Sequence, residues 1–438
     1  MAAILAFASP VHAQTASITG NISALVDHLP NVPAPGAAVG KDPVTELRLR
    51  AIVDAQMEAR PWLRFRFAGL ADGLVADRGG AVRSAAVDVL EAWVEFSGAG
   101  AELRAGMGRL AWGRLDEIQP TDVVNPIDVS RFLLDGRSEA RIAVPLVRAR
   151  LFPSDWLTVE GVIVPHFRRG RFDRLDEPSS PFNLLADPSP ADAAPPGFCG
   201  AVFTCAERWS FSREPLEGRA QAGARATFTS GRVDWSLSGW RGLLPFGLVA
   251  GGDPSTSTAS LVHSRFTMVG ADLETVRGKW AIRGEAAFFP RRPTQGGAGV
   301  RIFESNALEA GAGVDRRAGD FTLSATVLLR RDRVKYRVPE WPGLREPYVI
   351  LEEPITNLSL VTGFSRTFNR DRIETRVFSL VNPADRAAFV RGVLAWKPAD
   401  DVAIESSIGW FIGEGDDLIT RFGDRDFGYV RLKYFFGR

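Results

Sequence analysis

The residues with the clearest chemistry in this chain are arginines that recur at a spacing of two. The spacing is seen in Arg48, Arg50, Arg64, Arg66, Arg148 and Arg150, and arginines continue later in Arg219, Arg225, Arg283, Arg372 and Arg376. A guanidinium group is a planar, permanently charged fork that suits carboxylate or phosphate oxygens. Rows of such groups on one surface would attract anions. The alternative is that they form ion pairs with carboxylates on neighbouring strands and only keep a polar wall rigid.

Signals for catalysis or for metal binding are missing from the sequence. It contains no Gly-x-Ser-x-Gly, no His-Glu-x-x-His and no phosphate-cradling glycine loop. With four histidines and two cysteines, a His/Cys metal cluster is not expected. Cys199 and Cys205 are predicted to form a disulfide that closes a small loop. We therefore expect no enzyme, no cofactor and no metal site.

The arginines must be positioned by strands, because the sequence alternates between apolar and polar side chains. In residues 219–228 the even positions hold alanines and Phe228, and the odd positions hold mostly polar residues. A period of two places these sets on opposite faces of a β-strand. About eighteen such stretches follow one another along the chain. The pattern predicts an all-β fold, a transmembrane antiparallel up-and-down β-barrel of about 18 strands.

The connectors between these stretches support the same prediction. Turns after even-numbered strands are tight and rich in Gly, Asp, Asn and Pro, whereas several connectors after odd-numbered strands are long, for example 111–140, 167–218 and 332–357. Outer-membrane barrels have short periplasmic turns and long external loops in this order, whereas a soluble sandwich has no reason to keep it. We expect 167–218 to be a long external loop. No run approaches the ~20 apolar residues of a spanning helix.

The side of the sheet that faces lipid follows from the cost of burying charge. A Lys or Arg that faces lipid at the bilayer midplane costs about 2–4 kcal/mol. The third strand should therefore direct Phe65 and Phe67 outward, and Arg64 and Arg66 into the lumen. In 141–152 the apolar parity slips, which predicts a β-bulge near Pro145. The last strand, 427–436, resembles the aromatic-ended signal that the barrel-assembly machinery recognises.

The domain organisation and the cellular location follow from the two ends of the chain and from its charge. Residues 1–13 are predicted to be a signal peptide, and 14–438 a single barrel domain in the outer membrane of a Gram-negative cell. Outer-membrane lipid and lipopolysaccharide would be its surroundings. Basic and acidic residues nearly cancel, 53 against 52, so nucleic acid is not expected as a partner.

The third external connector counted from the N-terminus, 111–140, is unusually apolar for an external loop. Its polar residues include Asp116, Glu117, Asp122, Asn125 and Asp128, and its apolar residues between 127 and 134 could pack against the inside of a wall. Together with the strand number, this stretch resembles the Gram-negative porins, including eighteen-stranded substrate-selective channels and uncharacterised proteobacterial barrel proteins.

The resemblance implies a position and a role for this connector. In porins the third loop folds into the barrel and narrows it, so 111–140 would form a constriction whose acidic residues face the arginine rows. The expected function is passive diffusion of small hydrophilic, anionic solutes, in a monomer or a homotrimer. Three alternatives stay open: a loop packed on the barrel mouth, a closed structural barrel that sheathes a redox or periplasmic partner, and a polysaccharide exporter.

Overall fold

The computed structural model describes most of the chain. The described residues are 15–33, 41–78, 80–184, 210–213, 219–253, 258–295, 302–339, 348–414 and 418–437. The predicted signal peptide, 1–13, and the predicted disulfide between Cys199 and Cys205 lie outside these residues.

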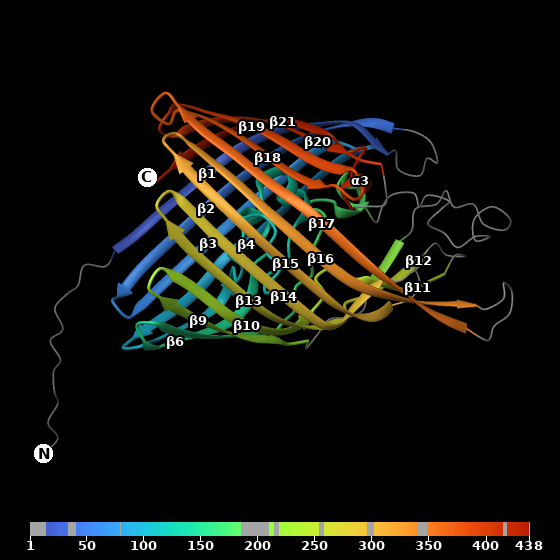
Figure 1. The fold of residues 1–438 in the computed structure, drawn as a ribbon. Coiled ribbons are helices and arrows are strands. Elements are labelled where there is room, and N and C mark those ends of the chain that lie inside the picture. The colour runs from blue at the N-terminus through green and yellow to red at the C-terminus, as the bar shows by residue number, and fades with distance from the viewer. Residues whose placement is uncertain are drawn as a thin grey trace, which may run out of the picture.

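Eighteen strands form one antiparallel sheet that closes on itself (Figure 1). The closure is direct, because β1 pairs with β2 on one side and with the last strand, β21, on the other. The prediction of an eighteen-stranded antiparallel barrel is confirmed. In chain order the barrel strands are β1 (Thr15–Pro33), β2 (Lys41–Arg60), β3 (Leu63–Asp77), β4 (Ala81–Gly98), β5 (Ala101–Gly108), β6 (Val144–Ser154), β7 (Leu157–Val164), β9 (Gln221–Ser230), β10 (Val233–Leu243), β13 (Arg265–Arg277), β14 (Trp280–Gln295), β15 (Ile302–Ala318), β16 (Phe321–Pro339), β17 (Tyr348–Phe368), β18 (Ile373–Asn382), β19 (Ala387–Ala399), β20 (Val402–Ile412) and β21 (Phe427–Phe436).

The remaining described elements are short. They are β8 (Ser210–Arg213), β11 (Leu248–Asp253) and β12 (Thr258–Val262), which form a small separate sheet, and the helices α1 (Val129–Asp135), α2 (Arg137–Ala140), η1 (Glu177–Ser179) and α3 (Leu418–Arg421). Among the described helices, none is long and apolar enough to cross a membrane.

The two ends of the barrel differ in their connectors. At one end, here called the short-turn end, strands are joined by tight turns, and Gly231, Gly278 and Gly319 each adopt a φ of 62° there. A positive φ is costly for residues with a side chain, so these turns require glycine. The other end, the long-loop end, carries the longer connectors. The predicted alternation of short and long connectors is therefore present in the closed barrel.

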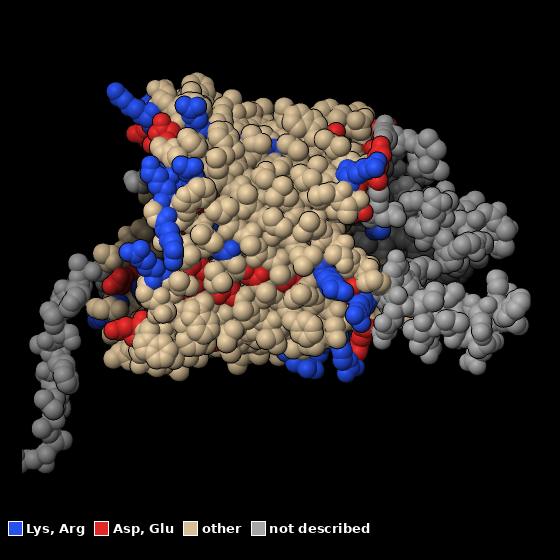
Figure 2. All heavy atoms as spheres, viewed as in Figure 1, with Lys and Arg blue, Asp and Glu red and all other residues tan. Residues whose placement is uncertain are grey.

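Side chains along the strands follow the predicted division between faces. Phe65 and Phe67 are exposed on the outside of β3, and the outward face of the barrel carries many other large exposed apolar side chains. Figure 2 shows the result as a band of mostly uncharged residues between two charged rims, with a row of acidic atoms visible in the middle of the band. Because a soluble barrel would not leave such a band in water, this surface matches a hydrocarbon environment.

The predicted bulge near Pro145 is wrong. The pairing of β5 with β6 runs without a shift from Val144 to Leu151, and the register shift in β6 lies further on, between Leu151 and Ser154 in its pairing with β7. Val144 and Leu146 are buried on the inner face. They pack in a hydrophobic cluster with Leu110, Trp112 and other residues inside the barrel, so an apolar parity here marks an internal packing site.

Candidate functional site

A segment of the chain between β5 and β6 lies inside the barrel. This inner loop, residues 109–143, contains α1 and α2 and includes the predicted constriction 111–140. Asp128 caps α1 by accepting hydrogen bonds from the Arg131 backbone N–H at 3.3 Å and from the Ser130 hydroxyl at 2.8 Å. Gly136, with a φ of 95°, separates the two helices. A capped and packed loop of this kind has a defined position in the lumen.

The first half of the inner loop is anchored to the wall at β13 and β14. The Glu285 carboxylate accepts hydrogen bonds from the backbone N–H groups of Arg114, at 3.0 Å, and of Thr121, at 2.6 Å. The Arg114 side chain in turn donates to Asp272 at 2.5 Å. Trp112 donates from its indole to Glu160 at 2.7 Å. Bonds to a charged acceptor are the stronger class, so this anchor holds the loop backbone firmly.

The second half is anchored to a different part of the wall, at β2 and β21. Asp135, the last residue of α1, accepts from Arg50 at 2.8 Å and pairs with Arg431 at 2.5 Å. Burial would raise the pKa of Asp135, but Arg431, Arg50 and Arg131 hold this pKa well below its ordinary value. The Tyr429 hydroxyl also donates to the Leu134 carbonyl at 3.1 Å.

The two anchors stand on opposite sides of the barrel. In the ring of eighteen strands β2 is the second strand in chain order and β14 the eleventh, so nine steps separate them in either direction. The inner loop therefore crosses the lumen from wall to wall and must narrow it.

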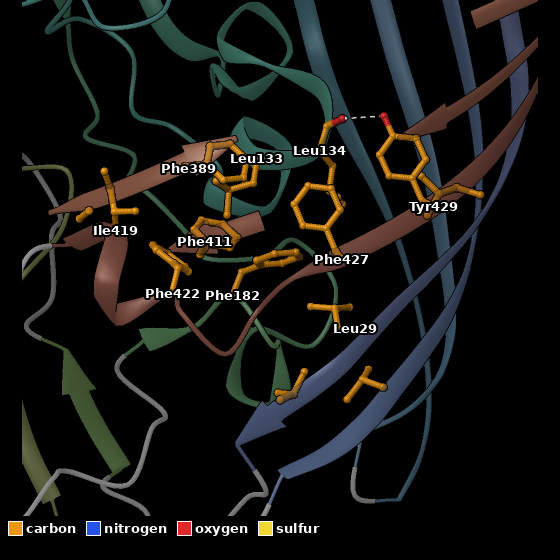
Figure 3. Close-up of a cluster of buried hydrophobic side chains, with 14 residues drawn as sticks. Leu29, Leu133, Leu134, Phe182, Phe389, Phe411, Ile419, Phe422, Phe427 and Tyr429 are labelled. Atoms are coloured by element: carbon orange, nitrogen blue, oxygen red, sulfur yellow. Dashed lines mark hydrogen bonds between the residues drawn. The ribbon is translucent and has the colours of Figure 1, made fainter. Parts of the chain in front are cut away.

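Apolar packing fixes the same crossing. Leu133 and Leu134 from α1 pack in one cluster with Phe389, Phe411 and Phe427 from three wall strands or their ends (Figure 3). Further round the ring, Leu115 packs against wall residues of β16 and β17. Removing such buried contacts costs several kcal/mol each, about 2–5 for a leucine.

A second segment also enters the lumen. Arg171 pairs with Asp128 of the inner loop at 2.7 Å, and Asp173 pairs with Arg48 of β2 at 2.5 Å. Leu175 and Phe182 are fully buried, and Phe182 belongs to the same cluster as Leu133. The part of the predicted external loop from 168 to 184 therefore lies against the inner wall, because its apolar and charged side chains find partners there.

Most of the predicted arginines are ion-paired in the wall. The pairs are Arg48 with Glu46 and Asp173, Arg50 with Asp72 and Asp135, Arg64 with Glu95, Arg66 with Asp54 and Glu91, Arg148 with Glu95, Arg150 with Glu102, Arg225 with Asp272, Arg283 with Asp116, Glu274 and Asp315, and Arg376 with Glu374 and Glu405. The other two, Arg219 and Arg372, donate to the backbone carbonyls of His263 and Pro398. Ion pairing within the protein and attraction of anions from the lumen therefore involve the same arginine side chains.

Within several of these pairs the cation faces water and the carboxylate does not. The Arg64 side chain is 45% exposed and its partner Glu95 is 2% exposed. Arg376 is 44% exposed against 9% for Glu405. Arg330 and Asp332 show the same order, 55% against 3%. Because the exposed guanidinium group lies closer to a solute in the lumen than the buried carboxylate behind it, such pairs present positive charge to that solute.

The predicted acidic residues of the inner loop have different partners. Asp116 accepts from Arg283 of β14 at 3.1 Å, and its side chain is half exposed. Burial and the neighbouring Asp315 raise the pKa of Asp116 above its ordinary value. Asp122 instead pairs with Arg137 and Arg141 of the loop itself. Within the described residues, Asp116 is thus the predicted carboxylate of the inner loop that forms an ion pair with an arginine of the wall, Arg283.

The other two predicted residues, Asn125 and Glu117, form hydrogen bonds within the inner loop and its stems. The Asn125 side chain accepts from the Leu110 N–H at 2.7 Å and donates to the Ile142 carbonyl at 2.8 Å, so it ties the two stems of the inner loop together. Glu117 contributes its backbone carbonyl to Arg137. Within the described ranges, no group of three or more His, Cys, Asp or Glu side chains could hold a metal ion.

Comparisons with known proteins agree with this architecture. A family model described as a protein of unknown function (DUF1302) matches residues 76–324. The solved structure of OccAB4 from Acinetobacter baumannii aligns with a TM-score of 0.51 and 10% identity over 96% of this chain and 98% of that chain. OccK9 (OpdG) from Pseudomonas aeruginosa aligns with a TM-score of 0.51 and 12% identity over 96% of this chain and 97% of that one. OccK2 (OpdF) from the same organism aligns with a TM-score of 0.51 and 10% identity, also over 96% of this chain and 97% of that one. The sequence matches no curated protein. At this identity the likeness concerns the fold, and it confirms the expected resemblance to outer-membrane porins.

Proposed function

This chain belongs to the family of proteins of unknown function DUF1302, and we propose that it is an outer-membrane channel through which small hydrophilic solutes diffuse passively, with a preference for anions. The proposed location is the outer membrane of a Gram-negative cell. The short-turn end would face the periplasm, and the long-loop end the outside, as in other barrels of this architecture.

The observation that carries the channel proposal is the inner loop held between opposite walls. Glu285 on one side and Arg50 with Arg431 on the other fix the loop across the lumen. A structural barrel with a sealed lumen would gain nothing from a wall lined with charged groups, which are costly to desolvate. A wall kept polar and partly solvated suits the passage of hydrated solutes.

The anion preference rests on the unequal exposure within the wall ion pairs. Arg64 and Arg376 point their guanidinium groups to water, whereas Glu95 and Glu405 are buried behind them. Exposed carboxylates also occur, at Asp116 of the loop and Glu139 of α2. The lumen therefore presents exposed guanidinium groups on the wall and exposed carboxylates on the inner loop. Such a lumen would favour anions while still admitting zwitterions.

The test is the reversal potential of purified protein in a planar bilayer, measured across a salt gradient around 0.1 M, where screening extends over about 10 Å. We expect an anion-selective potential in the wild type, and a shift toward zero in the variant R64Q/R376Q. The matched control R241Q/R316Q removes the same charge from the lipid-facing side and should keep the wild-type value. A cation-selective wild type, or equal shifts in both variants, would overturn the anion preference.

The closed structural barrel remains the second candidate, because two segments enter the lumen. It predicts no ionic current from the wild type or from variants with a loosened loop. Binding of a periplasmic or redox partner to the short-turn end would then be the function to pursue. A polysaccharide exporter would instead conduct ions and be blocked by a soluble polyanionic polysaccharide.

A further inference from the structure

The aromatic side chains that ring the outside of the short-turn end differ between the two halves of the barrel. Along β3 to β10 they stack on each other. Phe228 lies 4.1 Å from Trp235 and 6.2 Å from Trp156, measured between ring centroids, and Trp62 stacks on Phe96 at 6.3 Å. In this half of the ring, aromatic side chains contact other aromatic side chains.

Along β13 to β17 the aromatic rings contact arginines instead. The Arg316 guanidinium lies 4.9 Å from the ring centroid of Trp280, and that of Arg366 lies 4.6 Å from Phe368. The register of the strands makes this systematic, since Arg277 and Arg316 stand on either side of Trp280 on neighbouring strands. One strand further along the ring, Phe321 is directly opposite Arg366.

These arginines hold charge that the protein does not neutralise. In the described part of the chain, no ion pair joins Arg277, Arg316 or Arg366 to a carboxylate, in contrast to the arginines of the lumen. All three are exposed. Figure 2 shows Lys and Arg along this rim, with some Asp and Glu among them, beside the largely uncharged band.

We propose that this surface, formed by Arg277, Trp280, Arg316, Phe321 and Arg366, binds the headgroup of an anionic phospholipid. The inference rests on the proposed membrane location. Guanidinium groups bind phosphate oxygens through paired hydrogen bonds, and an indole between two of them lies at the depth where aromatic residues meet headgroups. The exposed apolar residues Leu323 and Phe364 continue toward the middle of the band and would contact the acyl chains.

Charge complementarity selects an anionic headgroup over a zwitterionic one. A phosphatidylcholine headgroup brings a trimethylammonium group close to two arginines, and repulsion offsets the attraction of its phosphate. A phosphatidylglycerol headgroup brings the phosphate alone. Each basic residue near an anionic surface favours binding by about fivefold, so two or three of them make a preference of at least tenfold.

The test is native mass spectrometry of the detergent-solubilised protein titrated with phosphatidylglycerol or with phosphatidylcholine of the same acyl chains. We expect the wild type to retain phosphatidylglycerol at a lipid concentration at least about tenfold lower than that needed for phosphatidylcholine. In R277Q/R316Q the two lipids should bind alike, and R277K/R316K should keep most of the preference. The control R60Q, at the end of β2 on the opposite side of the same rim, should behave as the wild type.

Equal retention of both lipids by the wild type would overturn the proposal, and so would an equal loss in the control variant. If R277Q/R316Q does not fold, salt provides the second readout. The wild-type preference for phosphatidylglycerol must then fall between 0.05 and about 0.5 M salt, because screening shortens to a few ångströms, and an unchanged preference would contradict a headgroup site. Failure of the barrel to insert into any bilayer would instead count against the proposed membrane function.

Discussion

Arg50 on β2 donates to Asp135 at the end of α1, with 2.8 Å between Nη1 and Oδ2, and so ties the wall to a loop that is anchored again half-way around the barrel. Arg431 of β21 holds the other carboxylate oxygen of Asp135. This small cluster therefore decides whether the inner loop stays across the lumen.

The first prediction concerns Asp135. D135N should release the end of α1, because Arg50 and Arg431 lose their shared anion and stay buried. Breaking a buried pair in this way costs about 3–5 kcal/mol of unfolding free energy. We expect larger and noisier single-channel conductance steps than in the wild type. The control D320N removes a carboxylate from an exposed turn and should leave both the free energy and the conductance unchanged.

The second prediction concerns coupling between the two anchors. E285A removes the acceptor of several loop donors, which should cost about 1.5–3 kcal/mol and also raise the conductance. Since both anchors are needed to hold the loop across the lumen, loss of one already releases it, and the double variant E285A/D135N should raise the conductance by less than the sum of the single changes. Strict additivity would mean that the two ends of the loop move independently.

The third prediction is a pH dependence of selectivity. Burial and Asp315 raise the pKa of Asp116, so this carboxyl is neutralised at higher pH than an ordinary Asp as the pH falls from 7 to about 4. The loop loses a negative charge opposite the wall arginines, and the anion preference should increase. Reversal potentials of the wild type and D116N measured at both pH values check this. The same pH response in D116N would assign the effect to other groups.

The contribution of Asp135 to the free energy of unfolding should stay constant over the pH range in which Asp116 begins to be neutralised. The pKa of Asp135 is held well below the ordinary value of an Asp, so the stabilisation is complete above pH ~4 and is lost as the pH falls through the lowered pKa. The free energy of unfolding of the wild type, relative to that of D135N, should therefore stay constant from pH 7 to about 4.5. A difference that already shrinks near pH 6 would contradict the ion-pair account.

The fourth prediction concerns the second inward segment. F182A should open a cavity and cost about 3–5 kcal/mol. It should also make Arg168, Arg169, Arg171 and Arg174 accessible to trypsin in a folded barrel, where the wild type is protected. The comparison variant F321A removes a ring from the outer face and should leave the segment protected. Rapid wild-type cleavage within 168–174 would place this segment outside the lumen.

The strands were predictable from sequence because lipid and water impose a period of two over the whole wall. Arg64 and Phe65 are neighbours on β3, and the polarity of each side chain alone predicts which face of the sheet it lies on. The position of the inner loop followed from its apolar residues and from its rank among the connectors. The inward course of 168–184 did not, because Asp173 meets Arg48 and Arg78 across about a hundred residues of sequence.

The candidate site was predictable in composition but not in pairing. Asp116 was expected to face wall arginines and contacts Arg283, whereas Asp122 and Asp128 bind arginines of the inward segments, which no spacing rule indicated. The anchoring roles of Asp135 and Tyr429 were missed for the same reason. The bulge prediction near Pro145 was wrong because Val144 and Leu146 are apolar residues of the inner face, which pack inside the barrel without a shift in register.

The most direct test of the central claim is the ionic current of the purified wild-type protein in a planar bilayer. A closed barrel with a loop tethered at Glu285 and Asp135 as its constriction predicts discrete conductance steps, which become larger in D135N. The absence of any step in both the wild type and folded, inserted D135N would contradict the channel account and favour a sealed structural barrel.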